Sequence, residues 1–364
     1  MQGSPDAIRA VSQRLESFFD DRADENRDLG AAAEPILRAA REALTGGKRL
    51  RAQFCLTGWR AVASAGRPAD DPPAAVVSAA SALEVFHAAA LVHDDIIDNS
   101  DTRRGRPSAH RALQAQHREA DWAGDAQAYG RSAAILLGDL LVAWSDDLLE
   151  EGAADCAPGP ASAARERYAR MRRDVTLGQY LDVAAEASHV QVPDDEQLHR
   201  ALQVASFKSA RYSVQQPLLI GAALAGATPE QDAALAAFGH PLGMAFQLRD
   251  DVLGVFGDSA VTGKPAGDDL REGKRTALIA LARPMLPPPL RRTLDELLGD
   301  PTLESGQIEA MQGALRDCGA LERVEQLIAD YAHEADRALA GAPLGHQAVG
   351  ALRDLAERAV SRTA

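Results

Sequence analysis

An apolar segment that ends in aspartates constrains the fold of this chain more than any other feature. In residues 79–90 the apolar side chains recur at helical spacing, which predicts a buried helix that continues into an acidic motif. In that motif Asp94 and Asp98 stand four apart and therefore share one face, with Asp95 beside them. Like charges at this spacing repel by roughly a few tenths of a kcal/mol when exposed, and more when partly buried. A divalent cation among the carboxylates would offset that repulsion, and paired hard oxygen ligands suit magnesium.

A second acidic pair, Asp250 and Asp251, follows another apolar segment with helical spacing. A single motif of this kind is more often a solvated helix end, and that interpretation is the alternative for each pair. Two such motifs in apolar helices of one chain could instead face each other across a helical core. Two carboxylate clusters on one cavity form an arrangement that binds a diphosphate through metal ions. We therefore expect both clusters to belong to one site.

Helical periodicity dominates the whole sequence, and alternating β-branched segments are hard to find. Clusters of Pro, Gly and Asp separate the helical segments, but none is long enough for an interdomain linker. We expect an all-α fold with a single domain over residues 1–364, a motif-bearing core at about 31–285 and C-terminal helices at 303–362. Helices are expected at 7–22, 31–45, 49–65, 74–98, 131–151, 162–188, 195–225, 230–256, 274–284 and 303–362, the last broken at Gly319 and around 341–345. The polar residues 115–130 are expected to form a surface insertion.

The charge balance and the cysteines limit the partners and the compartment. The formal net charge of −14 leaves no basic excess to neutralise a nucleic-acid backbone or to bind an anionic membrane surface. Cys55, Cys156 and Cys318 lie far apart without the spacing of metal ligands, so we expect reduced thiols. No signal peptide is visible, and no stretch approaches the ~18 uninterrupted apolar residues of a membrane span. We expect a cytoplasmic protein with no nucleic-acid partner and no stable membrane insertion.

Basic residues recur near glycines and near the acidic motifs. They are Lys48 and Arg51 after Gly46–Gly47, Arg103 and Arg104 after the first acidic motif, and then Lys208, Lys264 and Lys274. Each alone is more simply a solvated surface residue, whereas together they resemble a ring of cations around two carboxylate clusters. His87 lies seven residues before Asp94 on the same helical face, which gives it a positional reason to act in the site. His93, His110 and His117 are expected to be structural.

These features form an ordered set of motifs. The set comprises Gly46–Arg51, Asp94–Asp98 with Arg103–Gly105, Gly138–Asp139, Gly178–Gln179, Lys208–Ser209, Phe246–Asp251 and Gly263–Lys274. It resembles the trans-isoprenyl diphosphate synthase (polyprenyl synthetase) family over most of the chain, and is most similar to geranylgeranyl diphosphate synthases. The resemblance implies a bundle of long antiparallel helices around a deep central cavity, usually as a homodimer. It also implies a prenyltransferase that condenses isopentenyl diphosphate head to tail with an allylic diphosphate and uses magnesium, expected as three ions per site.

The resemblance assigns roles to individual residues. Magnesium would be bound by Asp94, Asp95, Asp98, Asp250 and Asp251. The allylic diphosphate would be held by Arg103, Lys208, Ser209, Gln247, Lys264 and Lys274, and isopentenyl diphosphate by Lys48, Arg51, His87 and Arg104. The five aspartates with Arg103, Lys208 and Lys264 would be the catalytic set. Cations and metal ions there would stabilise charge on the departing pyrophosphate, so that the allylic C–O bond ionises and the double bond of the co-substrate attacks.

The sequence departs from the family pattern at three places. Gly254 stands where the second acidic motif usually has a third aspartate, which puts one contact in the outer shell of the metal site in doubt. Ser209 replaces the usual threonine and keeps its hydroxyl. The segment between Arg106 and Gly138 is longer than is usual in the family.

Product length follows from the size of the side chains upstream of Asp94. In short-chain members of the family, an aromatic side chain four or five positions upstream forms the floor of the cavity. Here those positions hold Ala90 and Ala89, which are too small to stop a C15 chain, and Phe86 is the next bulky side chain. We therefore predict a C20 product, geranylgeranyl diphosphate, with C15 and with C25 or longer as the alternatives.

Two other functions share some of these features. A class I terpene cyclase has acidic motifs, magnesium and an all-α fold, but it commonly stabilises cations with aromatic faces, and aromatic residues make up only 4% of this chain. A cyclase also has no need of an isopentenyl diphosphate site such as Lys48, Arg51 and Arg104 would provide. A non-catalytic helical partner subunit would be expected to lose its metal-binding aspartates, and this chain retains both clusters.

Overall fold

The computed structural model describes residues 5–65, 71–257 and 267–360, and within them the chain divides into two compact units. Unit 1 comprises Met1–Arg165 and Ile220–Ala227, and unit 2 comprises Glu166–Leu219 and Thr228–Ala364. The two units are described separately below. The single domain expected from the sequence stays a prediction.

Unit 1 is built from helices and one short hairpin. Its elements are α1 (Pro5–Glu25), η1 (Arg27–Ala32), α2 (Glu34–Ala43), α3 (Leu50–Ala63), α4 (Ala74–Ile97), β1 (Thr102–Arg103), β2 (Arg106–Pro107), α5 (Ala109–Glu119) and α6 (Ala126–Ala153). Two further helices, α7 (Pro158–Ser188) and α9 (Gln216–Leu224), have residues in both units.

Unit 2 is helical throughout its described part. Its elements are η2 (His189–Gln191), α8 (Asp194–Val204), the π-helical η3 (Ala205–Gln215), α10 (Pro229–Phe256), α12 (Asp268–Glu272), α13 (Ala277–Met285), α14 (Pro288–Leu297), α15 (Ser305–Asp317), α16 (Ala320–Ala338) and α17 (His346–Val360). Together with unit 1 this confirms the all-α fold class.

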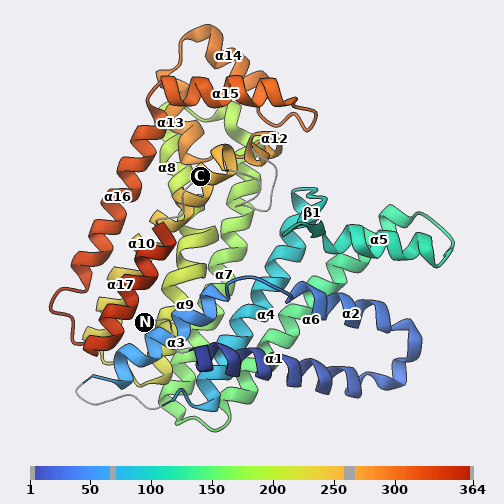
Figure 1. The fold of residues 1–364 in the computed structure, drawn as a ribbon, viewed down its shortest axis with the longest axis vertical. Helices are drawn as coiled ribbons and strands as arrows, with labels where there is room; N and C mark the ends of the chain where they lie inside the picture. The colour runs from blue at the N-terminus through green and yellow to red at the C-terminus, as the bar shows by residue number, and fades with distance from the viewer. Residues whose placement is uncertain (1–4, 66–70, 258–266, 361–364) are drawn as a thin grey trace. The chain divides into compact units, whose positions relative to one another are not determined.

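Helix α4 forms the centre of unit 1. It packs against α6, α3 and α1, and Figure 1 shows α4 and α6 running side by side. Leu83, Val85 and other side chains of α4 are fully buried, and this burial at about 25 cal/mol per Å² of apolar area is what holds the helix. The carboxylate of Glu84 is buried as well and accepts a hydrogen bond of 3.0 Å from the amide of Ala52, in the first turn of α3. The core of unit 1 therefore fixes the helix that carries the first acidic motif.

Helix α10 has the same role in unit 2. It begins with a capping box in which Thr228 and Gln231 satisfy each other's backbone amides, with Pro229 at the first helical position. It packs against α16 and η3. Its Leu248 and Val252 belong to a buried apolar cluster with residues of α12, α13, α15 and α16. This cluster fixes the helix that carries the second acidic motif.

The predicted helices match the observed ones with three differences. The run 195–225 is helical but contains the π-helical segment η3, and the run 303–362 breaks at Gly319 and near residues 341–345 as expected. Helices α5, α12 and α14 and the β1–β2 hairpin were not expected. The segment 115–130 is only partly a surface insertion, because α5 and α6 extend into it and the side chain of His117 is buried.

Helix α4 is long and apolar enough to cross a membrane, judged by length and composition alone. However, 72% of its most apolar 18-residue window is buried inside the protein, as in the core helix of a soluble protein. The structure is therefore consistent with a soluble protein, and the cytoplasmic location stays a prediction.

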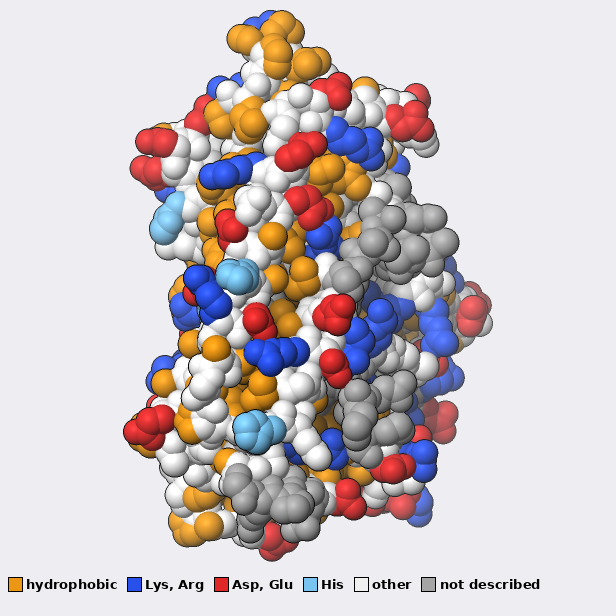
Figure 2. Space-filling view, turned by 60° about the vertical axis from the view of Figure 1, so that its left-hand side comes forward, with side chains coloured by type: hydrophobic (Ala, Val, Ile, Leu, Met, Phe, Trp, Pro, Cys, Tyr) orange, Lys and Arg blue, Asp and Glu red, His pale blue; other side chains and the backbone are white. Residues whose placement is uncertain are grey.

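The cysteines carry free thiols, and one face of the protein is mixed in charge. Cys55, Cys156 and Cys318 are all free thiols, and burial raises the pKa of Cys55 to about 12. On the face drawn in Figure 2, Lys and Arg side chains lie next to Asp and Glu side chains, so this face is mixed in sign rather than basic.

Candidate active site

The first acidic motif lies in the last turn of α4. Asp94 and Asp98 are partly exposed, and Asp98 is the residue at which the helix ends. Asp95 is buried, with 3% of its surface exposed. Because the motif is at the C-terminal, negative end of the helix dipole, its carboxylates need nearby cations.

A short hairpin brings one cation to this motif. Strands β1 and β2 pair antiparallel with Arg103 opposite Arg106, and the turn between them contains Arg104 at a positive φ of 54°. The guanidinium of Arg103 donates to Asp95 Oδ1 from Nε at 2.9 Å and also from Nη2, and its Nη2 lies 3.4 Å from Asp94 Oδ2. Such charge-assisted contacts are among the stronger hydrogen bonds. Asp95 therefore positions Arg103, while Asp94 and Asp98 keep the more open positions.

Three arginines from other elements lie near His87, which is on α4 like Asp94. Burial, and then the charges of Arg51, Arg104 and Arg103, lower the pKa of His87 well below its usual value of 6.5, so the imidazole is neutral at pH 7. Burial and neighbouring arginines, Arg49 among them, also lower the pKa of Arg104. So many cations around a neutral imidazole form a ready site for a multivalent anion. We call Arg49, Arg51, His87, Arg103 and Arg104 the basic cluster.

Gly138 and His93 explain another motif in unit 1. A Cβ atom at position 138 would lie 2.2 Å from Nε2 of His93, so the absence of a side chain there admits the imidazole. Nε2 of His93 lies 3.2 Å from the carbonyl oxygen of Ile135 and 3.5 Å from the carboxylate of Asp139. His93 thus packs α4 onto α6 beside Asp94, which agrees with the structural role predicted for it.

The second acidic motif lies near the end of α10 in unit 2. Gln247 donates a 2.6 Å hydrogen bond from Nε2 to Asp251 Oδ1, one turn away. Burial raises the pKa of Asp251 well above its usual value of 3.8, and the charges of Asp269, Asp250 and Asp182 raise it further. Several carboxylates of unit 2 therefore lie close to Asp251, which is a setting that a bound cation would stabilise.

The space beside Gly254 is occupied by Asp269. A Cβ atom at position 254 would lie only 2.0 Å from Oδ2 of Asp269. Asp269 is the second residue of α12. The carboxylate of Asp269 thus lies where a side chain at position 254 would begin. Asp269 can approach this closely because position 254 holds glycine instead of the usual third aspartate.

Two of the predicted lysines lie together in unit 2. Lys208, on η3, donates from Nζ to Asp182 Oδ2 at 2.5 Å, and Nζ of Lys274 lies 3.5 Å from the same oxygen and 3.3 Å from Glu186. Lys264 lies outside the described residues. Asp182 and Glu186 belong to α7, and neither was expected from the sequence.

Comparison with known proteins identifies the family that has this combination of sites. The sequence profile of the polyprenyl synthetase family matches residues 34–315, which is most of the chain. The chain belongs to the polyprenyl synthetase family. It is therefore a prenyltransferase that lengthens isoprenoid chains, and the resemblance seen in the sequence is confirmed.

Several relatives of this polyprenyl synthetase are characterised. Geranylgeranyl diphosphate synthase of Methanosarcina mazei is 31% identical over 327 residues, which cover 89% of this chain and 86% of that protein. Geranylfarnesyl diphosphate synthase of Aeropyrum pernix is 30% identical over 300 residues, covering 82% and 84%. The crystal structure of geranylgeranyl pyrophosphate synthase from Corynebacterium glutamicum, complexed with isoprenyl diphosphate and magnesium, has a TM-score of 0.91 at 37% identity and covers 98% of this chain and 99% of that chain.

The remaining predicted residues of this polyprenyl synthetase differ in how far they are buried. The side chain of Lys48 is exposed, whereas Ser209 is partly buried on η3 next to Lys208. Phe86 and Ala89 are buried, with 6% and 0% of their surface exposed, and Ala90 is partly exposed. The roles assigned to these residues by resemblance stay predictions.

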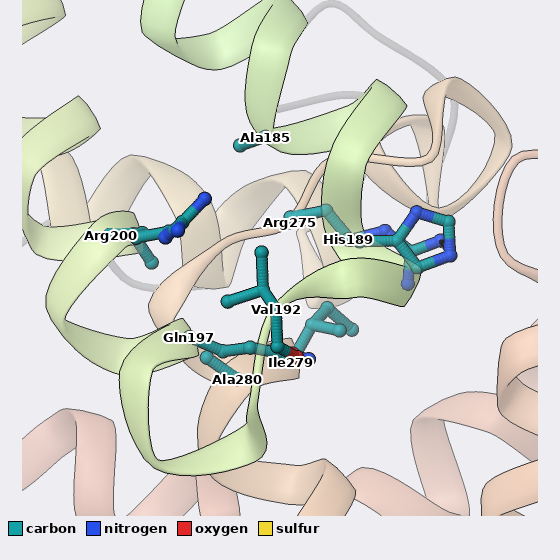
Figure 3. Close-up of a pocket in the computed structure, with 9 residues that line it drawn as sticks. Ala185, His189, Val192, Gln197, Arg200, Arg275, Ile279 and Ala280 are labelled. Carbon is teal, nitrogen blue, oxygen red and sulfur yellow. Dashed lines mark hydrogen bonds between the residues drawn. The ribbon is translucent and has the colours of Figure 1, made fainter.

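A separate pocket in unit 2 lies among α7, η2, α8 and α13 (Figure 3). The guanidinium of Arg275 donates from Nη2 to Nε2 of His189 at 3.0 Å, and Nδ1 of His189 lies 2.8 Å from the carbonyl oxygen of Glu186, to which it donates. Arg275 directly follows Lys274. The pocket therefore includes the contact that ties the segment after Lys274 to the end of α7.

Proposed function

We propose that this polyprenyl synthetase condenses isopentenyl diphosphate head to tail with an allylic diphosphate, releases pyrophosphate and makes the C20 product geranylgeranyl diphosphate. The observation that carries the proposal is the likeness, over nearly the whole chain, to a geranylgeranyl pyrophosphate synthase solved with isoprenyl diphosphate and magnesium. The basic cluster in unit 1 and the two lysines in unit 2 are the groups that diphosphates require.

Magnesium is the metal that the carboxylates suit. Asp94, Asp98 and Asp250 offer hard oxygen ligands, and the carboxylates close to Asp251 would be stabilised by a bound cation. In the described part of the chain no group of three or more His, Cys, Asp or Glu side chains is arranged to hold a metal ion by itself. Mg²⁺ commonly takes one or two carboxylates and completes its octahedron with water and substrate phosphates, so such partial sites fit it. Three ions per site, with Asp95 and Asp251 in supporting positions, complete this part of the proposal.

The allylic diphosphate is held by cations. Arg103, Lys208, Lys264 and Lys274 would bind its oxygens, with Ser209 donating a hydroxyl. Gln247 donates to Asp251 and so orients that carboxylate. Its side-chain amide would also contact the diphosphate. Bound metal ions would supply electrostatic stabilisation of charge on the leaving pyrophosphate.

Isopentenyl diphosphate is assigned to Lys48 and to the members of the basic cluster other than Arg103. Arg51, His87 and Arg104 were expected there, and the lowered pKa values of His87 and Arg104 support their closeness to other cations. Arg49 joins them, and Lys48 is the exposed member of the set. Anchoring both substrates by their diphosphates holds the double bond beside the allylic carbon, which converts a bimolecular encounter into a positioned reaction.

The reaction then needs little from side chains beyond charge and position. The arginines and lysines stabilise the pyrophosphate as the allylic C–O bond breaks. The double bond of isopentenyl diphosphate attacks the allylic cation, and a proton is lost from the resulting cation. The departing pyrophosphate is the base that we assign to this step, since no side chain is an evident candidate.

Product length is assigned to the face of α4 that carries Asp94. On a helix, Phe86, Ala90 and Asp94 are four residues apart and share this face. Ala89, the other position that the resemblance assigns to the floor, is completely buried, so Ala89, Ala90 and Phe86 are the residues that would limit the chain. The small Ala90 admits a C15 primer, and Phe86 one turn deeper stops the product at C20.

A homodimer is the assembly that we propose. Leu177, Tyr180 and Val183 follow one another at helical spacing along α7 with 56%, 68% and 41% of their surfaces exposed. Large apolar side chains exposed in this number are typical of a contact surface. A second copy of this chain is the partner that we assign to it.

The proposal is tested by the incorporation of labelled isopentenyl diphosphate into acid-labile product. Purified protein is assayed with C5, C10 and C15 allylic diphosphates, with Mg²⁺ or with a chelator in its place. We expect incorporation only with Mg²⁺ and an allylic primer. Product formed from an allylic diphosphate alone would instead indicate a cyclase, and no incorporation by folded protein would overturn the proposal.

A further inference from the structure

One face of α7 lies against both of the lysines that the proposed function assigns to the allylic diphosphate. Gly178, Asp182 and Glu186 are spaced by four residues, so they share this face. At position 178 a Cβ atom would lie 2.3 Å from the backbone nitrogen of Lys208, which no side chain could tolerate. Gly178 therefore allows the backbone of η3 to approach α7 at the residue that carries the first lysine.

Asp182 lies one turn further along and contacts both ammonium groups. Its Oδ2 accepts a 2.5 Å hydrogen bond from Nζ of Lys208, and Nζ of Lys274 is 3.5 Å from the same oxygen. Asp182 is buried, with 8% of its surface exposed, and the side chains of Lys208 and Lys274 are 22% and 12% exposed. One carboxylate thus brings together two lysines that are distant in the sequence.

The second lysine has further anchors on α7. Glu186, one turn after Asp182, lies 3.3 Å from Nζ of Lys274. Arg275 is tied to His189, which directly follows α7, as Figure 3 shows. These contacts fix both the side chain of Lys274 and the chain immediately after it.

Two ammonium groups this close repel unless a carboxylate lies between them. Each ammonium has three donor hydrogens, so a lysine bonded to Asp182 keeps donors for other acceptors. Holding the lysines in place before substrate arrives lowers the ordering cost of binding. Asp182 also adds to the raised pKa of Asp251, which indicates that the same carboxylate lies near the second acidic motif.

We propose that Asp182 is a positioning residue of the allylic diphosphate site. In the substrate-free enzyme its carboxylate holds Lys208 and Lys274 together, and the diphosphate binds to the same two ammonium groups. The proposal rests on the assignment of these two lysines to the allylic diphosphate. It gives the Gly178–Gln179 motif a role, because Gly178 sets the approach on which the contact of Asp182 depends.

The test compares Asp182→Asn with a matched variant on the same helix, Asp174→Asn. Asp174 lies two turns before Asp182 and pairs with Arg211 of the same element, η3, at 3.2 Å, but Arg211 has no part in the proposed site. Each variant therefore removes one carboxylate that links α7 to η3. Steady-state rates are measured with the allylic and isopentenyl diphosphates varied separately, and melting temperatures are recorded.

For Asp182→Asn we expect KM for the allylic diphosphate to rise by about tenfold or more, as when a charge-assisted contact is lost. KM for isopentenyl diphosphate should change by less than about twofold, as should both constants in Asp174→Asn. Equal effects of the two variants, or equal effects on both substrates, would show a structural ion pair only and overturn the proposal.

A second variant covers the case in which Asp182→Asn does not fold. Asp182→Glu keeps the charge and moves it by one methylene group, so it should still raise KM selectively for the allylic diphosphate, by a smaller factor. An unchanged KM in folded Asp182→Glu with unfolded Asp182→Asn would overturn the proposal. Absence of condensation by the wild-type enzyme would instead overturn the proposed function itself.

Discussion

The lowered pKa of His87 makes the stability of the folded chain depend on pH. Its pKa in the folded protein lies well below 6.5, whereas an unfolded histidine titrates near that value. Below pH 6.5 the unfolded chain takes up a proton that the folded chain does not, so stability is present above this pH and is lost as the pH falls. As the pH falls below 6.5, the free energy of unfolding of His87→Gln should therefore decrease less than that of wild type. The difference should be up to about 1.4 kcal/mol per pH unit.

Urea unfolding at about pH 7.5 and about pH 5.5 measures this difference. His199→Gln, at an exposed histidine of α8, is the control and should keep the wild-type pH dependence. The same pH dependence in His87→Gln and wild type would contradict the assignment of a neutral, buried imidazole.

Gly254 offers a second prediction at the residue scale. Restoring the aspartate that the family usually has here should impair this enzyme, because Asp269 already occupies the space. We expect Gly254→Asp to displace Asp269 and to raise the Mg²⁺ concentration for half-maximal rate by about tenfold, a typical effect of disturbing residues around a metal site. Adding Asp269→Ala should recover part of the loss.

Gly350→Asp is the matched control, since a side chain at Gly350 on α17 meets open space. It should leave the Mg²⁺ requirement unchanged. A Gly254→Asp enzyme that needs less Mg²⁺ than wild type would show that Asp269 does not fill the missing position.

The sequence named the candidate site residues, whose roles stay predictions, but it did not give their partners. Arg103 and Gln247 were expected to face substrate, yet both donate to aspartates of the acidic motifs. Asp182 stands four residues after Gly178, and that helical spacing could have pointed to it. Which oxygen a side chain contacts depends on tertiary packing, and a single sequence does not contain that information.

At the scale of elements, the proposal assigns the limit on product length to helix α4. Ala90→Phe should shorten the product to C15 or less, and Phe86→Ala should lengthen it beyond C20, because both residues share the face of Asp94. Ala89→Phe, at the other position assigned to the floor, should shorten the product as well, at an overpacking cost of about 1–3 kcal/mol because position 89 is fully buried. Mass analysis of the dephosphorylated alcohols gives the chain lengths. A C20 product from Ala90→Phe would remove this face of α4 as the limit.

Helix boundaries were predictable where an apolar period ended in Gly, Pro or a capping residue. Helix α5 was missed because its residues are mostly polar and only Leu113 and its buried neighbours pack inward. Helix α14 was not expected because a cluster of prolines such as 287–289 usually separates helices, whereas here Pro288 and Pro289 begin the helix, where proline is tolerated. The π-helical turn of η3 leaves no sign in hydrophobic periodicity.

At the scale of the whole molecule, the exposed apolar side chains of α7 test the assembly. A homodimer should have twice the chain mass of 38.6 kDa. The double variant Leu177→Asp and Tyr180→Asp should shift the protein to monomer, because two charges would have to be buried in the contact. Leu290→Asp, at an exposed leucine of α14 that is 46% exposed, is the control and should remain a dimer. Light scattering after size-exclusion chromatography gives the masses, and a dimer in the double variant would contradict the assignment.

The most direct test of the central claim is the mass of the product made by the wild-type enzyme. Purified protein is given Mg²⁺, isopentenyl diphosphate in excess and each allylic primer in turn, and the products are dephosphorylated and resolved by mass spectrometry. The account predicts a C20 alcohol as the main product from every primer that is accepted. A main product of C25 or longer, or of C15, would contradict the C20 assignment, and no condensation with any primer would contradict the proposed reaction.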